Sequence, residues 1–139
     1  MRYLLDVNLL VSWGWSDHAD HARVAQWISR IKRVRSAMLF TSPIPELGFV
    51  RVSVQRAGGR LSPMEAGRTL AGMLATLGSH HGFLPDDLPA TDWPEWCRGS
   101  GQTTDAHLVS LAEKHGARLA TLDTGIPDAF VLPLGNLHG

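Results

Sequence analysis

The chain has 139 residues, and its 13 Lys plus Arg balance its 13 Asp plus Glu, so it has the length of one domain and no charge bias that names a partner. Its single cysteine, Cys97, excludes an intrachain disulfide and a thiolate metal site, which suits a reducing compartment. There is no apolar run of transmembrane length, and Asp6 interrupts the N-terminal apolar stretch, so we expect a cytoplasmic protein without membrane contact.

The first half of the chain alternates short apolar runs with segments of helical spacing. Strands are expected at 2–6 and 38–41, and helices at 8–13, 17–33 and 42–55. An alternative stays open in the last of these helices, because Val50, Val52 and Val54 also fit the alternation of a strand. His18 and His21 lie three residues apart in the expected second helix, and we interpret both as solvent-facing.

The second half continues the alternation. Ser62 with Pro63 and Glu65 predicts a capped helix start, and this helix should run to about Leu77. A very short strand at 83–84, a loop over 85–101, a helix from Thr103 or Thr104 to His115, and strands at 117–121 and 130–134 should follow. We therefore predict one α/β domain over 1–139, a three-layer α/β/α arrangement with a central, mostly parallel sheet of four to five strands.

Acidic residues stand at the boundaries of the expected elements. Asp6 and Asp123 end two strands, while Glu46 and Asp105 lie in the first turns of helices that follow strands. The carboxyl ends of parallel strands meet at one edge of a sheet, so all four acids should meet there. Acids held close together in a protein are costly unless a positive charge compensates them. We therefore predict a shared divalent cation, and oxygen donors favour Mg²⁺ or Mn²⁺ over zinc.

Such a site suits the hydrolysis of phosphodiesters by an activated water, with the four acids as the catalytic set. Asn8 and Thr104 are candidates for holding a water or a phosphate oxygen beside the metal, although helix capping and turn formation explain them equally well. For Thr121 and Thr124 we favour the turn interpretation.

The segments around the acids resemble the motifs of PIN-domain nucleases. The resemblance lies in Leu4-Leu5-Asp6-Val7-Asn8, in the segment 42–52 around Glu46, and in the segments 102–108 and 115–123, in the family's order and spacing. The segments are most similar to VapC-type toxins of bacterial type II toxin–antitoxin pairs. This resemblance implies a PIN fold, a Mg²⁺-dependent endoribonuclease acting on RNA, a homodimer, and a small antitoxin whose tail enters the acidic site.

Two further sets of residues follow from this resemblance. Arg51 and Arg56, further along the expected helix of Glu46, are candidates for binding RNA phosphates or the acids of an antitoxin. Many relatives carry another acid, Ser or Asn soon after the fourth motif. This chain has Asp128 in that region, and its membership of the site stays open.

Other functions compete with this interpretation. A DNA-directed nuclease would use the same metal site, and a PIN-like scaffold would keep the fold without activity. A receiver-like phosphoacceptor module also places acids at strand ends, but it expects paired acids early in the chain and a late Lys. Asp6 stands alone, and residues 117–139 contain no Lys, which counts against a receiver.

Overall fold

The computed structural model describes residues 1–135, in which strands and helices alternate along the chain. The strands are β1 (Arg2–Leu5), β2 (Met38–Thr41), β3 (His81–Phe83), β4 (Arg118–Thr121) and β5 (Phe130–Val131). The α-helices are α1 (Val7–Gly14), α2 (His21–Ile31), α3 (Pro43–Arg56), α4 (Pro63–Ala75) and α5 (Thr103–Lys114), and short 3₁₀ turns cover Gly78–His80 and Ser100–Gln102. None of the helices within residues 1–135 is long and apolar enough to cross a membrane.

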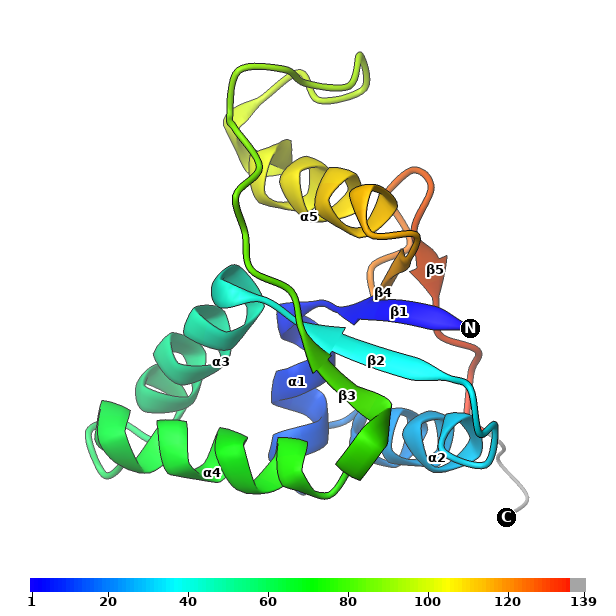
Figure 1. Ribbon diagram of the computed structural model, residues 1–139. Coiled ribbons are helices and arrows are strands. Elements are labelled where there is room, and N and C mark those ends of the chain that lie inside the picture. The colour runs from blue at the N-terminus through cyan, green and yellow to red at the C-terminus, as the bar shows by residue number, and fades with distance from the viewer. Residues whose placement is uncertain (136–139) are drawn as a thin grey trace.

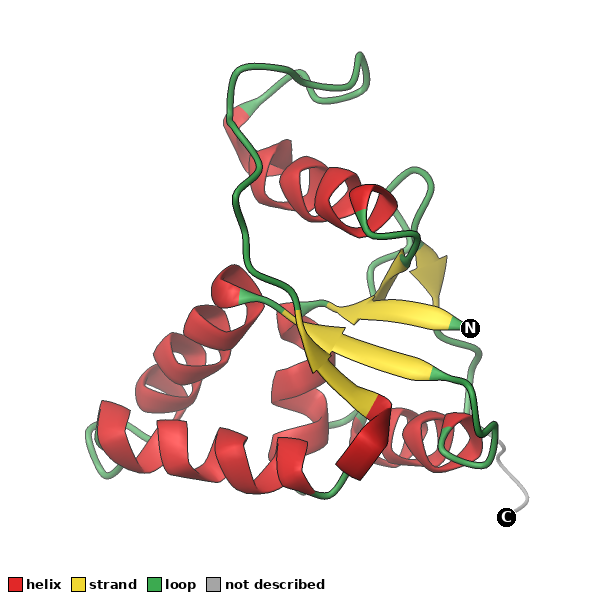
Figure 2. Ribbon diagram, viewed as in Figure 1, coloured by secondary structure: helices red, strands yellow, loops and turns green. Residues whose placement is uncertain are grey.

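The five strands form one sheet in the order β3-β2-β1-β4-β5, and every neighbouring pair is parallel. Helix α5 covers one face of this sheet, and α1 to α4 lie on the other (Figure 1). Figure 2 shows the same three layers by element type, with the strands enclosed between helices. The predicted three-layer α/β/α architecture with a parallel sheet is therefore confirmed.

Each face of the sheet packs its own apolar core, because successive strand residues point to opposite faces. Leu4 and Leu5 of β1 are both fully buried, but Leu4 packs with Leu108 of α5 and Leu5 packs with Leu10 of α1. In the same way Leu119 and Ala120 of β4 divide between the two cores. The central strands are thus held from both sides, which fixes where their carboxyl ends lie.

The strand order places a crevice beside β1. In the sheet β2 lies on one side of β1 and β4 on the other. The segments that follow β1 and β4 therefore lead away from each other at the carboxyl ends of these two strands. Open parallel sheets bind ligands at such points. Asp6 follows β1 directly, and Asp123 lies two residues beyond β4. The fold therefore brings these two acids to the edge where a ligand site is expected.

Helix boundaries depart from the sequence predictions where turns compete with helices. Helix α2 begins at His21, not at residue 17, because the segment before it forms tight turns: the His18 amide donates to Trp15 O, and the His21 amide donates to His18 O. Residues 43–56 form a helix, which settles the alternative left open by the valines. Helix α5 has Gln102 at its N-cap, whereas the Thr103 hydroxyl donates to the carbonyl of Ser100.

Strand boundaries depart as well. The third strand covers 81–83 in place of the expected 83–84, and the last strand ends at Val131, whereas 134 was expected. Both are edge strands with a hydrogen-bonded neighbour on one side only. Their length depends on how far that neighbour extends, and the local apolar pattern does not contain this information.

Close approach of α3 to the start of α1 depends on Gly48. A Cβ atom at this position would lie 2.5 Å from Cγ2 of Val7, the residue after Asp6. We predict that Gly48→Ala destabilises the protein by about 1–3 kcal/mol through overpacking. Gly72→Ala is the matched control, because it lies in the exposed part of α4 with nothing within 4 Å. That control should stabilise by about 0.5–1 kcal/mol. Urea unfolding measures both, and equal stability of the two variants would contradict the packing described.

Candidate active site

A cavity of about 480 Å³ lies at the carboxyl ends of β1 and β4. Its lining residues are Asp6, Val7, Asn8, Val11, His18, Arg51, Val52, Thr104, Asp105 and Asp123. Six of these are residues that the sequence singled out as catalytic, supporting or binding candidates: three of the four acids, both supporting residues and one of the two arginines. The residues come from the end of β1, from α1, α3 and α5, from the turns before α2 and from the segment after β4, so the fold assembles the cavity from distant parts of the chain.

Asp6 is the buried member of the acidic set, with 6% of its surface exposed. It is the N-cap of α1, and its Oδ1 accepts a hydrogen bond from the Val7 amide at 2.8 Å. Its Oδ2 accepts a second one from the hydroxyl of Thr121, also at 2.8 Å. Both carboxylate oxygens are therefore oriented, and these bonds offset part of the cost of burying an acid.

Thr121 connects the two strand ends through its hydroxyl. While this group donates to Asp6, it accepts from Nδ2 of Asn8 at 3.0 Å and from the Asp123 amide at 3.1 Å. Asn8 in turn accepts from the Leu122 amide through its Oδ1 at 3.2 Å. Thr121 is fully buried at the end of β4, and it is more than the turn residue that the sequence suggested. Its role follows from the β1–β4 register, in which Leu5 pairs with Ala120.

The carboxylates in the cavity act on one another electrostatically. Burial raises the pKa of Asp6 above its ordinary 3.8, hydrogen bonds from Thr121 and Val7 lower it, and the charge of Asp123 raises it. Burial also raises the pKa of Asp105, and the charges of Asp6 and Asp123 raise it further. Asp123 itself is exposed, and its Oδ1 accepts from the Gly125 amide at 2.8 Å. The negative charges of the three carboxylates therefore act together in one cavity.

Glu46 does not line this cavity. It lies in the first turn of α3, where its Oε2 accepts a 2.6 Å hydrogen bond from the Thr41 hydroxyl at the end of β2. Nε2 of His81 lies 2.8 Å from the same hydroxyl, and it is the donor if the hydroxyl proton points to Glu46. Burial lowers the pKa of His81, against the opposing effect of the Glu46 charge. Glu46 thus belongs to a separate hydrogen-bonded group at the neighbouring strand end.

The remaining candidates divide between the cavity and other surfaces. Arg51 lines the cavity, whereas Arg56 pairs with Asp17 at 3.1 Å and lies over the Trp15 ring, 5.1 Å from its centroid. Asp128 is not among the lining residues and has a left-handed backbone with φ of 63°.

His18 lines the cavity although we interpreted it as solvent-facing. The turns before α2 bring it to this place, and a helix starting at residue 17 would not contain them. His21 also has a structural contact, since its Nδ1 lies 3.0 Å from the carbonyl oxygen of Ser12. The sequence did not indicate the positions of His18 and His21, because both positions depend on where α2 begins.

The donors around the cavity fit a hard divalent cation by their chemistry. The charges of Asp6 and Asp123 both raise the pKa of Asp105, so the three carboxylates favour a cation that neutralises them. Oxygen donors suit Mg²⁺ or Mn²⁺. As the side chains stand, no group of three or more His, Cys, Asp or Glu within residues 1–135 is arranged around a single position for a metal ion. The carboxylates therefore suit a divalent cation by their donor type and charge. Their side chains would have to move to coordinate one ion together.

Comparisons with known proteins find the same family over nearly the whole chain. The PIN domain family model matches residues 3–130. Ribonuclease VapC39 of Mycobacterium tuberculosis is 36% identical over 135 residues, which cover 93% of this chain and 94% of that protein. Ribonuclease VapC38 of the same species is 39% identical over 126 residues, covering 88% and 86%.

A solved structure shares the fold. It is described as a domain of a functionally unknown protein from Methanocaldococcus jannaschii, and it matches with a TM-score of 0.51 over 97% of this chain and 93% of that chain. Its sequence is 17% identical, so this likeness concerns the fold alone.

The raised pKa of Asp6 predicts a pH-dependent stability when divalent cations are removed. A carboxyl group whose folded-state pKa exceeds its unfolded value stabilises the fold below the unfolded pKa and loses this contribution as the pH rises through the folded-state value. In EDTA, Asp6→Asn should therefore melt at a higher temperature than the wild type near pH 7, and the gain should vanish towards about pH 4.

Asp87→Asn is the matched control for this measurement. The hydrogen bond from Lys114 lowers the pKa of Asp87, so its substitution should give no gain near pH 7. Thermal melts across this pH range test the prediction, and an Asp6→Asn protein less stable than the wild type near pH 7 would contradict it.

Proposed function

We propose a function for this chain on the basis of its family: the chain belongs to the PIN-domain family and is similar to the VapC-type nucleases. We infer that it is an endoribonuclease that hydrolyses RNA phosphodiester bonds with the help of Mg²⁺ or Mn²⁺. The observation that carries the proposal is the cavity in which Asp6, Asp105 and Asp123 meet with Arg51. The names of the relatives, which describe them as ribonucleases, support the proposal of RNA over DNA as the substrate.

The proposed mechanism assigns a task to each side chain in the cavity. Asp6, Asp105 and Asp123 would hold the cation, which supplies Lewis acidity and positive charge to phosphodiester hydrolysis when it is bound. The Thr121 hydroxyl and the Val7 amide orient the Asp6 carboxylate by donating to its two oxygens.

Asn8, Thr104 and Arg51 have supporting tasks in this mechanism. Asn8 keeps Thr121 in place through its amide, and its hydrogen bond to the Leu122 amide holds the segment that leads to Asp123. Arg51 lines the same cavity and suits a phosphate oxygen of the substrate. Thr104 is an exposed residue in the first turn of α5 that lines the same cavity, and its proposed task is to donate to another phosphate oxygen.

Glu46 completes the proposed acidic set from the neighbouring strand end. Helix α3 begins at the same edge of the sheet as the cavity, and Thr41 fixes the Glu46 carboxylate there by a 2.6 Å hydrogen bond. The proposed role of Glu46 is to contribute negative charge to the cation site after a side-chain movement away from Thr41.

The proposed biological role is that of a toxin paired with an antitoxin protein. In this role an acidic tail of a small antitoxin would enter the cavity and contact Arg51, whereas Arg56 is already engaged with Asp17. A homodimer in the cytoplasm is proposed on the same family basis.

RNA cleavage tests the proposal. Purified protein is incubated with single-stranded and structured RNA, and with DNA of matched sequence, in Mg²⁺ or EDTA. We predict cleavage of RNA in Mg²⁺ only, and a loss of more than about a hundredfold in rate for Asp6→Asn and Asp105→Asn, because both remove a proposed cation ligand. Glu113→Gln is the control, since Glu113 is an exposed carboxylate on α5 that does not line the cavity. RNA cleavage that survives both EDTA and Asp6→Asn would refute the mechanism.

A further inference from the structure

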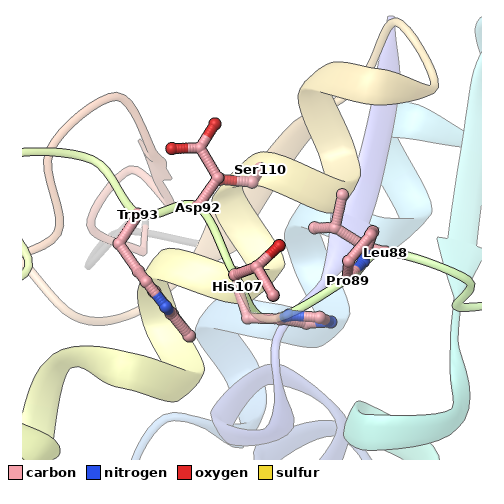
Figure 3. A pocket seen from close by; sticks show the side chains of 7 residues that line it. Leu88, Pro89, Asp92, Trp93, His107 and Ser110 are labelled. Carbon is pink, nitrogen blue, oxygen red and sulfur yellow. The ribbon is translucent and has the colours of Figure 1, made fainter.

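A second cavity, of about 290 Å³, lies between α5 and the segment 84–102 (Figure 3). Its lining residues are Leu88, Pro89, Thr91, Asp92, Trp93, His107 and Ser110. Both cavities take side chains from helix α5. Thr104 and Asp105 in its first turn line the acidic cavity, and His107 and Ser110 further along line the second one. Thr104 and His107 are three residues apart and so neighbour each other on the helix surface, which makes the two cavities neighbours along α5.

The segment that forms one wall of this second cavity is held in place. His107 pairs with Asp86 at 2.6 Å, and Lys114 pairs with Asp87 at 2.8 Å, so two contacts attach the segment to α5. Leu88 and Trp96 pack against the core beneath α5. The cavity is therefore formed before any ligand arrives, which reduces the entropy lost on binding.

Trp93 is an aromatic side chain that the protein leaves accessible at this cavity. Its surface is 39% exposed, and its Nε1 donates to the carbonyl of Ala90 at 3.2 Å, which fixes the indole. Figure 3 shows Trp93 reaching the cavity from the loop, while His107 and Ser110 reach it from α5. The cavity thus has an aromatic wall on one side. On the other it has two hydrogen-bonding groups, the Ser110 hydroxyl and the Nδ1 atom of His107, whose Nε2 is already paired with Asp86.

Charge and size restrict the occupant. Among the described residues that line the cavity there is no Lys or Arg, and Asp92 is present, so a phosphate group is disfavoured. The volume lies at the lower end of the range for small-molecule pockets and suits a single planar ring system. Unpaired bases of RNA are recognised in this way, by stacking on an aromatic ring and hydrogen bonding at the base edge.

We propose that this second cavity binds one unpaired base of the RNA substrate, close in sequence to the cleaved bond. Trp93 stacks on the base, and His107 and Ser110 face its edge. This inference rests on the proposed function for the identity of the substrate. It assigns Trp93 to substrate binding and not to the chemical step.

The first test detects base binding without any cleavage. The indole N–H resonance of Trp93, assigned by its absence from Trp93→Phe, is followed during titration with each of the four nucleoside 5′-monophosphates and with ribose 5-phosphate. We expect a saturable shift with at least one nucleotide and none with ribose 5-phosphate. No shift with any nucleotide, or the same shift with ribose 5-phosphate, would overturn the proposal.

The second test measures cleavage of unpaired RNA oligonucleotides. Trp93→Ala should raise KM about tenfold, in line with the loss of one base stack, and leave kcat within about twofold. Trp93→Phe should restore KM because it keeps a ring, and Met64→Ala, which truncates an exposed apolar side chain on α4, should change nothing. Melting temperatures close to that of the wild type identify the variants as folded.

The outcomes separate the two proposals. If the wild type cleaves RNA and Trp93→Ala has an unchanged KM, the base site is refuted and the ribonuclease proposal stands. If no variant cleaves RNA, the ribonuclease proposal fails, and the indole titration alone decides whether the cavity binds a base. Normal cleavage by Trp93→Ala together with weaker binding of an antitoxin would assign the cavity to a protein partner, against this proposal.

Discussion

The hydrogen bond from the Thr121 hydroxyl to the buried carboxylate of Asp6 is the contact on which the candidate site depends. It joins the carboxyl ends of β1 and β4, and through Asn8 and the Asp123 amide it also fixes the first turn of α1 and the segment after β4. The two apolar cores hold these strands from both faces, so the network has a rigid base. Removing the Thr121 hydroxyl would leave the buried Asp6 carboxylate without this donor. The resulting loss of folding free energy would exceed the net contribution of the hydrogen bond, because a buried acceptor without a partner is costly.

The chain gathers negative charge at this point at the expense of stability. Burial raises the pKa of both Asp6 and Asp105, and neighbouring carboxylates raise these values further. A fold selected for stability alone would separate these groups, so their arrangement supports the proposal of a cation that neutralises them. Membership of the VapC-type PIN nucleases supports the same explanation from an independent direction. In the proposed function, Arg51 would supply the positive charge with which this acidic cavity binds an RNA phosphate.

Much of this arrangement could be predicted from the sequence, because a parallel sheet places the carboxyl ends of its strands at one edge. This rule located Asp6, Asp105 and Asp123 correctly relative to one another. It did not locate Glu46, because the direction of a side chain in a first helical turn depends on local partners, and Thr41 draws this one away. The importance of Thr121 depends on the strand register. His18 reaches the cavity only because α2 begins later than its apolar spacing suggests.

The central claim is that Asp6, Asp105 and Asp123 share a divalent cation. Isothermal titration of Mn²⁺ into the wild type and into the three single Asp→Asn variants tests it most directly, because binding is measured without any substrate. We expect saturable binding by the wild type and an affinity at least about tenfold weaker in each variant. An absence of Mn²⁺ binding by the wild type, or equal affinity in the wild type and all three variants, would contradict it.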